Sequence, residues 1–296
     1  MTDSNKNFLH DMEGWSQFFF FFFLSISGLM FTIVALQLCV DITQLDQSPK
    51  IMRMALTLQS VCAFLVPSLA FAYLTQNSTK QYLKTEHYQN ILFLSLSILL
   101  IIVIQPMIDC IAHYNQQLTL PESMSALEKW IQEGELSAEK TTNLLFGDKT
   151  ITGLIFNLLV IALVAGLAEE FFFRGCVQQI MQKIVKNKHA AVWISAVIFS
   201  AIHFQFYGFV PRVLLGAVLG YLFVWAGNIW VPVIVHTVNN TIGVILSFIY
   251  YGSPQYENIE NFNFEQNLEI VIISSILSIL LLIFIYRRRK SAKISD

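Results

Sequence analysis

Two adjacent glutamates and an arginine stand inside a stretch of the chain that is otherwise apolar. Glu169, Glu170 and Arg174 follow the apolar run 151–165, and three phenylalanines lie between the glutamates and the arginine. On insertion scales an ionised side chain at membrane depth costs about 2.5 kcal/mol or more, so such groups persist where they face a protein interior and serve a function. These three residues are therefore the first candidates for chemistry.

The spacing of the three residues predicts different surroundings for the two carboxylates. Glu170 and Arg174 are four positions apart, so on a helix they share one face and can form an ion pair. Glu169 lies about 100° further round the helix and has no such local partner. One carboxylate is then neutralised, while the other stays free for acid–base work.

Two later segments add further polar groups, with His203 four positions after Phe199 and His236 four positions before Asn240. Taken singly, a histidine or asparagine in a membrane often makes only a hydrogen bond between helices, and Glu170–Arg174 can be a purely structural ion pair. Their combination on three helices is harder to explain structurally. The candidate catalytic residues are Glu169, Glu170, Arg174, His203, His236 and Asn240.

Composition places these residues in a membrane protein. Hydrophobic residues make up 55% of the 296 residues and charged residues 13%, with a mean hydropathy of +0.59, whereas soluble domains carry about 25% charged residues. The net charge of −2 gives no reason to expect a nucleic-acid partner. The four cysteines form no CxxC pair and are expected to be buried small hydrophobes. No cleavage site ends the first apolar run, which we expect to remain as an anchor.

We predict an all-α fold, a polytopic membrane helix bundle of about eight transmembrane helices. The fourth is expected to continue past Arg174 and to turn near residues 187–188, and the fifth and sixth are short. A spanning helix needs about 20 apolar residues. The predicted spans are 17–40, 52–74, 88–112, 151–173, 192–207, 209–226, 230–251 and 268–286.

The distribution of lysine and arginine predicts the orientation. With the N-terminus inside, eleven of the 18 Lys and Arg residues fall in inside segments and six in outside segments, as the positive-inside rule favours. Both termini are then cytoplasmic, and the candidate site lies in the inner half of the membrane. The outside loop 114–150 should contain an amphipathic interfacial helix at 120–131 with Met124, Leu127 and Ile131 on its apolar face. The acidic loop 255–265 is expected to be solvated.

These features give four predicted parts of the chain. They are a cytoplasmic tail (1–16), N-terminal helices with the long loop (17–150), a catalytic core (151–251), and a last helix with a basic cytoplasmic tail (252–296).

The motifs resemble those of the CPBP family, which comprises CAAX prenyl proteases and bacteriocin-processing (Abi) intramembrane proteases. Three motifs match in order: Glu-Glu-x-x-x-Arg from Glu169, Phe-x-x-x-His ending at His203, and His-x-x-x-Asn from His236. The resemblance covers about residues 155–245. It implies an endopeptidase in a bacterial inner membrane that cuts a membrane-associated protein or peptide. The substrate, its prenylation and the oligomeric state stay open.

Peptide hydrolysis needs an activated water, a proton donor and stabilisation of the oxyanion. We assign Glu169 as the general base and His203 as the group that orients the water, with His236 and Asn240 stabilising the oxyanion or substrate. Glu170 with Arg174 holds the helix and tunes the field. Two histidines and two glutamates could hold Zn²⁺, but no His-Glu-x-x-His is present. A mechanism that requires no cofactor is our first choice, and Zn²⁺ is the alternative.

Two other functions remain open. Intramembrane Glu and His also serve proton relays, so a proton-coupled transporter is one alternative, which would have paired broken helices or an inverted repeat. A non-catalytic membrane scaffold or immunity protein of the same family is the other. For the protease, the expected partners are the lipid bilayer and, as substrate, a membrane protein or peptide.

Overall fold

The computed structural model describes residues 9–289, apart from 77, 87–89, 119 and 254–266. Helices are the only regular elements over these residues, so the predicted all-α class is confirmed. The elements are α1 (Gly14–Cys39), η2 (Ile42–Gln44), α2 (Pro49–Gln59), η3 (Ser60–Leu65), α3 (Val66–Thr75), α4 (Thr79–Tyr82), α5 (Ile91–Val103), α6 (Gln105–Gln116), η4 (Glu122–Met124), α7 (Ser125–Gly147), α8 (Ile151–Asn157), η5 (Leu158–Val164), α9 (Ala165–Phe172), η6 (Phe173–Val177), α10 (Gln178–Val185), α11 (Lys188–Ala201), α12 (Phe209–Ala226), α13 (Trp230–Tyr250) and α15 (Leu268–Arg288).

Within the described residues, six helices are long and apolar enough to cross a membrane. A seventh span is present if α5 and α6, which meet at a 40° bend, are counted as one. The prediction of about eight spans also counted α11. This helix has 14 residues, so it rises only about 21 Å at 1.5 Å per residue, less than the ~30 Å hydrocarbon core. It ends at Ala201, before the predicted limit of 207, because the chain turns back towards α12.

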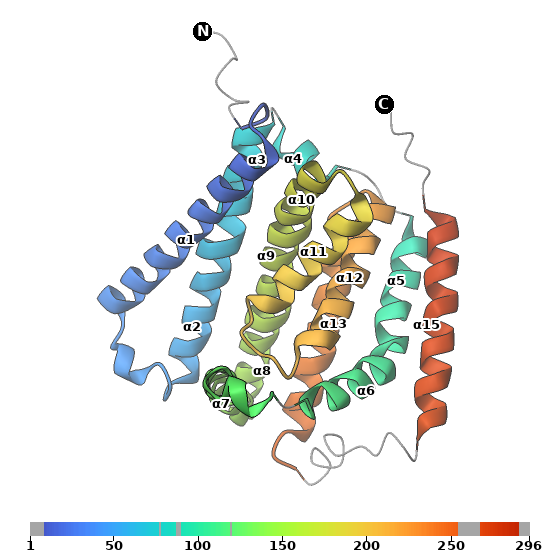
Figure 1. The fold of residues 1–296 in the computed structure, drawn as a ribbon. Helices are drawn as coiled ribbons and strands as arrows, with labels where there is room; N and C mark the ends of the chain where they lie inside the picture. The colour runs from blue at the N-terminus through green and yellow to red at the C-terminus, as the bar shows by residue number, and fades with distance from the viewer. Residues whose placement is uncertain (1–8, 77, 87–89, 119, 254–266, 290–296) are drawn as a thin grey trace.

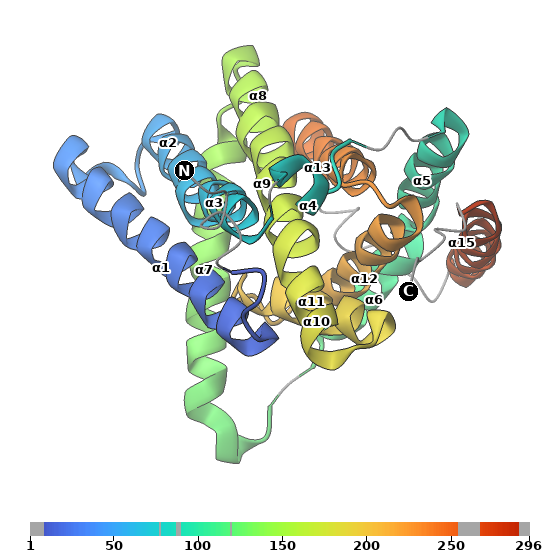
Figure 2. The same cartoon turned by 90° about the horizontal axis from the view of Figure 1, so that it is seen from above.

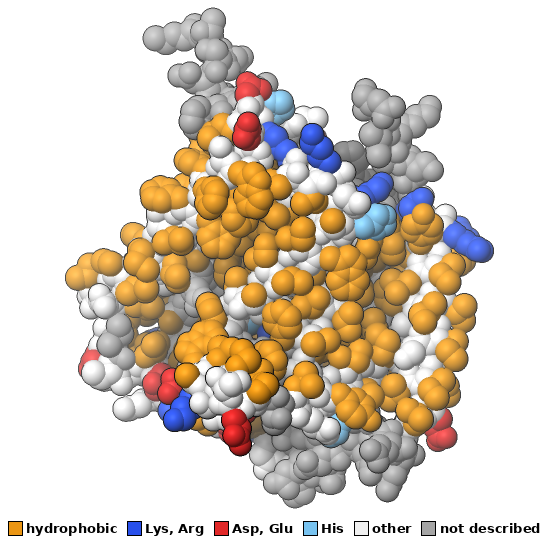
Figure 3. All heavy atoms as spheres, viewed as in Figure 1, with side chains coloured by type: hydrophobic (Ala, Val, Ile, Leu, Met, Phe, Trp, Pro, Cys, Tyr) orange, Lys and Arg blue, Asp and Glu red, His pale blue; other side chains and the backbone are white. Residues whose placement is uncertain are grey.

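The outer surface has the distribution expected of a membrane protein. Figure 3 shows a broad apolar belt, with charged side chains gathered towards its two edges. Large apolar side chains point outward from the flanking helices, among them Phe19 at 66% and Leu38 at 81% exposure. The start of α1, the end of α15 and the α10–α11 turn lie at the same edge (Figure 1). The predicted topology requires both ends of the chain and this turn to lie on the same side of the membrane, and this arrangement agrees with it.

The longest helix is the continuous run Ile151–Val185, which includes two π-helical segments, η5 and η6. It continues past Arg174 as predicted. The chain then turns at Lys186, which is in the left-handed region with φ +53°, and Asn187 caps α11 through its side chain. The helices α1 to α3 flank this run on one side, with α5, α6 and α15 on the other side of the bundle (Figures 1 and 2).

The two glycines of α12 bring it close to α11. A Cβ on Gly216 would lie 3.2 Å from Ala196 Cβ, and one on Gly220 would lie 2.9 Å from a Val192 methyl group. The GxxxG spacing therefore marks close helix packing, as is usual in membranes. Their buried carbonyls also accept hydrogen bonds from Arg174 (2.8 Å) and Gln178 (3.3 Å), which are themselves four residues apart.

Helix α7 runs across the edge of the bundle opposite the α10–α11 turn (Figures 1 and 2). It extends far beyond the predicted 120–131. Of the predicted apolar face, Ile131 is buried, whereas Met124 and Leu127 are 42% and 40% exposed. Its ring contact from Trp130 to Phe204, at 5.9 Å between centroids, docks it on the turn between α11 and α12. The predicted solvated loop 255–265 lies outside the described residues.

Candidate active site

Glu170 is fully buried and lies between two partners. Its Oε1 accepts a hydrogen bond from Arg174 Nη1 at 2.7 Å and another from His236 Nδ1 at 2.7 Å. The ion pair predicted from the four-residue spacing is therefore present. The contact to His236 was not predicted, because it joins α9 to α13 across 66 residues of sequence.

Arg174 is 1% exposed and fixes three elements at once. Besides Glu170, its guanidinium donates from Nη2 to the Gly216 carbonyl of α12 at 2.8 Å. The same group lies over the Phe199 ring of α11, 5.1 Å from the centroid. Arg174 thus connects α9, α11 and α12 behind the two glutamates. Its planar guanidinium, which has several N–H donors, compensates the buried carboxylate of Glu170.

Glu169 points away from this pair, as the 100° offset predicts. Its side chain is 16% exposed, and its Oε2 lies 3.8 Å from His236 Nε2. That distance is too long for a direct hydrogen bond, so a water can bridge the two groups. The close approach of α9 and α13 requires Gly166, because a Cβ there would lie 2.8 Å from Thr237 Oγ1.

His203 stands just beyond the end of α11 and has a defined tautomer. Its Nδ1 lies 2.7 Å from the Phe199 carbonyl, which can only accept, so Nδ1 donates this bond and, in the neutral imidazole, Nε2 keeps its lone pair. The turn that follows is tied to other elements: Glu135 Oε1 of α7 accepts from Tyr207 N at 2.9 Å, and Asn115 Nδ2 of α6 donates to the Phe206 carbonyl at 2.8 Å.

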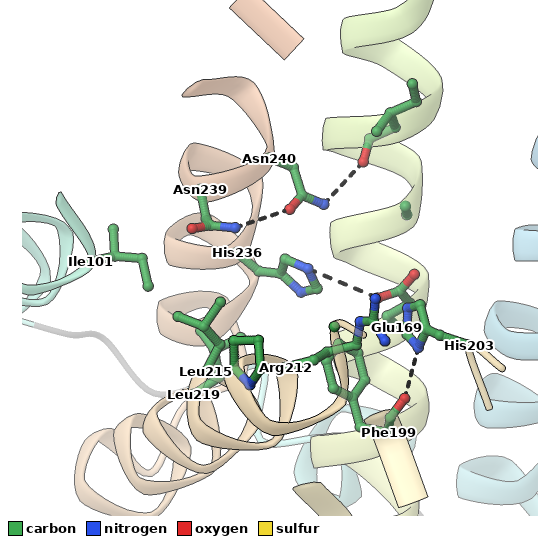
Figure 4. Close-up of a pocket in the computed structure, with 14 residues that line it drawn as sticks. Ile101, Glu169, Phe199, His203, Arg212, Leu215, Leu219, His236, Asn239 and Asn240 are labelled. Atoms are coloured by element: carbon green, nitrogen blue, oxygen red, sulfur yellow. Dashed lines mark hydrogen bonds and ion pairs between the residues drawn. The ribbon is translucent and has the colours of Figure 1, made fainter. Parts of the chain in front are cut away.

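Asn240 occupies the same face of α13 as His236, one helical turn along. Its Nδ2 donates to the Ile161 carbonyl of η5 at 3.0 Å, and its Oδ1 accepts from Asn239 Nδ2 at 3.3 Å. Figure 4 shows Glu169, His203, His236 and Asn240 around a common space. The structure therefore brings together Glu169, His203, His236 and Asn240, with Glu170 and Arg174 behind them.

That space is a cavity of about 420 Å³. A second cavity of about 440 Å³, lined mainly by apolar side chains of α2, η3 and η5, lies on the other side of Glu169 and His203. Both residues line both cavities. An extended peptide that occupies both cavities would therefore pass the carboxylate of Glu169 and the free nitrogen of His203.

Arg212 also lines the first cavity, and sequence reasoning missed it. It lies in the first turn of α12, within the predicted span 209–226, and its Nη2 donates to Gln205 Oε1 at 2.7 Å. An arginine inside an apolar helix was the available signal, by the same reasoning that selected Arg174.

The described residues contain no group of three or more His, Cys, Asp or Glu arranged to hold a metal ion. Of the candidate Zn²⁺ donors, Glu170 faces Arg174 and His236 Nδ1 rather than the cavity. The donor set as arranged does not form the three- or four-ligand site that zinc requires.

Comparison with known proteins confirms the resemblance seen in the motifs. Residues 151–242 match the profile of a family described as type II CAAX prenyl endopeptidase Rce1-like. The chain is 24% identical over 148 residues to an uncharacterized protein, YpbD, of Bacillus subtilis, covering 49% of this chain and 68% of that protein. It is 30% identical over 118 residues to an uncharacterized 24.3 kDa protein of Escherichia coli, covering 37% of this chain and 52% of that protein. No solved structure matches.

Residues 151–242 thus resemble an Rce1-like domain, and the apolar helices around them are those of an integral, multi-helix membrane protein. The family is one of proteases. The matched segment contains all six candidate residues, from Glu169 to Asn240.

Proposed function

We propose that this chain is an intramembrane endopeptidase that hydrolyses a peptide bond of a membrane-associated protein or peptide. The observation that carries the proposal is the position of Glu169 and His203 on the wall shared by two cavities, with His236 and Asn240 facing the first cavity. A carboxylate with no cationic neighbour on its own helix face, beside an imidazole with a free lone pair, is a suitable pair for activating water.

In the proposed reaction a water lies between Glu169 and His203 Nε2. Glu169 accepts a proton as the water oxygen bonds to the carbonyl carbon, and the carbonyl oxygen becomes an oxyanion. The second N–H of the Asn240 amide stabilises that charge, and His236 adds a hydrogen bond to it when its Nε2 is protonated. Collapse of the intermediate breaks the C–N bond, and the proton held by Glu169 passes to the leaving amine. The products are a carboxylate and a free amine, and no cofactor is consumed.

Glu170 and Arg174 support this chemistry without touching the substrate. Because His236 Nδ1 donates to Glu170, the imidazole ring has a fixed orientation with Nε2 directed towards Glu169. Such a carboxylate behind a histidine is a common way of fixing ring orientation and tautomer.

The first experiment compares wild type with Glu169→Gln. Membranes from cells producing each protein are analysed by mass spectrometry for peptides that are cut only with wild type. Purified proteins are then assayed with a farnesylated peptide and its unfarnesylated counterpart, a choice guided by the description of the matched family. Glu169→Gln should lower cleavage by at least about 100-fold, because the amide cannot accept the proton of the water. Equal cleavage by both purified proteins would exclude Glu169 as the base.

Orientation is the second part of the proposal: both termini and the α10–α11 turn face the cytoplasm. In a chain without its native cysteines, a cysteine replacing Lys188 should be protected from an impermeant thiol reagent added outside intact cells. A cysteine replacing Glu139 of α7 should react. Both positions are exposed. The reverse labelling pattern would invert the topology and place the site in the outer half of the membrane.

A further inference from the structure

Three side-chain amides form a continuous hydrogen-bonded chain that ends at the candidate site. We name Gln105, Asn239 and Asn240 the amide chain. Gln105 Nε2 donates to Asn239 Oδ1 at 2.8 Å, and Asn239 Nδ2 donates to Asn240 Oδ1 at 3.3 Å. Gln105 begins α6, at the 40° bend after α5, and lies outside the segment that matches the protease family.

Backbone carbonyls at both ends fix the direction of the amide chain. Gln105 Nε2 also donates to the Ile101 carbonyl at 3.0 Å, and Asn240 Nδ2 donates to the Ile161 carbonyl at 3.0 Å. A carbonyl oxygen can only accept. The nitrogen of each terminal amide must therefore face its carbonyl, and the middle amide has one orientation that satisfies both neighbours.

A π-helical segment makes the acceptor at the site end available. In an α-helix the Ala165 N–H would bond to the Ile161 carbonyl, but here it bonds to Val160 and Ala162 instead. The Ile161 carbonyl can then accept from Asn240. Single π-helical turns are frequent at functional sites, and this one gives the catalytic helix a contact to α13 beside Glu169.

The amide chain uses one N–H of Asn240 and its only oxygen. The nitrogen has a second N–H, and Asn240 lines the cavity that contains Glu169 and His203. We propose that Gln105 and Asn239 are positioning residues that hold the Asn240 amide with this N–H towards the oxyanion of the scissile carbonyl. The proposal rests on the proposed protease function. Without the two neighbours, only the Ile161 carbonyl would orient the amide, and the amide could more readily rotate and present its oxygen to the developing negative charge.

Gln105→Glu tests the direction of the chain with almost no change of shape. A protonated carboxyl still donates to Asn239 Oδ1, whereas an ionised one can only accept. Ionisation should therefore turn the Asn239 amide over and, through it, the Asn240 amide. We expect kcat of the variant relative to wild type to be near one at low pH and to fall about 10- to 100-fold as the introduced carboxyl ionises, with little change in KM. A residue that only supports packing would not introduce this pH dependence.

Asn239→Asp breaks the next link and serves as the second variant. Its ionised carboxylate still accepts from Gln105 but has no N–H for Asn240. Because both variants act through one amide, the kcat loss of the double variant should be well below the product of the single losses. Gln116→Glu is the matched control, since it makes the same chemical change at an exposed position of the same helix.

Two readouts separate this inference from the proposed function. Suppose that cleavage depends on Glu169 but that kcat of Gln105→Glu has the same pH profile as kcat of Gln116→Glu. The positioning role of Gln105 would then be wrong, while the proposed protease function would stand. Absence of Glu169-dependent cleavage would instead sink the protease proposal. In that case the side-chain amide NMR signals of Asn240, in ¹⁵N-asparagine-labelled protein and assigned by their loss in Asn240→Leu, still test the chain. Signals of Asn240 that do not move with pH in Gln105→Glu would show that the amides are not coupled.

Discussion

Replacement of Arg174 by methionine should destabilise the protein because it leaves a buried carboxylate uncompensated. Arg174 and Glu170 have 1% and 0% side-chain exposure, and their charged atoms are 2.7 Å apart. Methionine keeps much of the volume but removes the charge and all donors. Glu170 then retains only the bond from His236, and the Gly216 carbonyl loses its side-chain donor.

The size of the stability loss follows from the buried Glu170 carboxylate that the substitution leaves without its cation. Breaking a buried ion pair by removing one partner typically costs about 3–5 kcal/mol, because the remaining charge stays buried. At about 2–4 °C per kcal/mol, the expected fall in Tm is roughly 10 °C. Neutralising the stranded carboxylate should restore part of this loss. We therefore expect Glu170→Gln/Arg174→Met to be more stable than Arg174→Met alone by at least about 1 kcal/mol.

The assay is thermal unfolding of purified protein in one detergent, followed by intrinsic fluorescence. Arg288→Met is the control, since it removes an arginine at the exposed end of α15 and should change stability by no more than about 0.5 kcal/mol. The reasoning is refuted if Arg174→Met has the same Tm as wild type, or if Glu170→Gln/Arg174→Met is no more stable than Arg174→Met.

Three further predictions concern the surroundings of the site. Thr150 and Arg53 hydrogen-bond to Asp148 and lower its pKa below the ordinary 3.8. Asp148→Asn should therefore reduce the free energy of unfolding by ~1–3 kcal/mol above about pH 4, and this difference from wild type should shrink below pH 3.8. Chemical unfolding at each pH measures it. Glu135→Leu removes the acceptor of Tyr207 N, so the turn after His203 should loosen and kcat fall about 10-fold, with Tm nearly unchanged. Protein stripped by a chelator to far below one metal per chain should keep its activity, and His203→Ala should not change metal content; zinc that leaves with that variant would establish the alternative mechanism.

The parts of the site that lie on one helix could be predicted from sequence. The spacing of Glu170 and Arg174 predicts their ion pair, and the 100° offset predicts that Glu169 faces elsewhere; both are found. The turn near 187–188 was also correctly predicted. These features depend on helical periodicity and on local caps, which short stretches of sequence determine.

Contacts between helices could not be predicted in the same way. His236 was expected to act with Asn240 towards the substrate, and nothing in its own segment indicated that Glu170 would accept from its Nδ1. Periodicity states which residues share a face, but it does not state which face of another helix lies opposite. The early end of α11 is a similar case, because the apolar pattern continues past Ala201 while the chain turns back.

Gln105 shows where sequence reasoning could have gone further. It follows the apolar run 91–104 and precedes Pro106, so a polar amide stands at membrane depth beside a helix break. An unpaired polar group there would cost several kcal/mol. The logic that selected Glu169 from its charge therefore applies to an uncharged amide as well. Applied to every polar side chain in an apolar run, the same reasoning would have predicted a hydrogen-bond partner for Gln105. The amide chain supplies that partner, and it extends the candidate site beyond the segment that carries the family motifs.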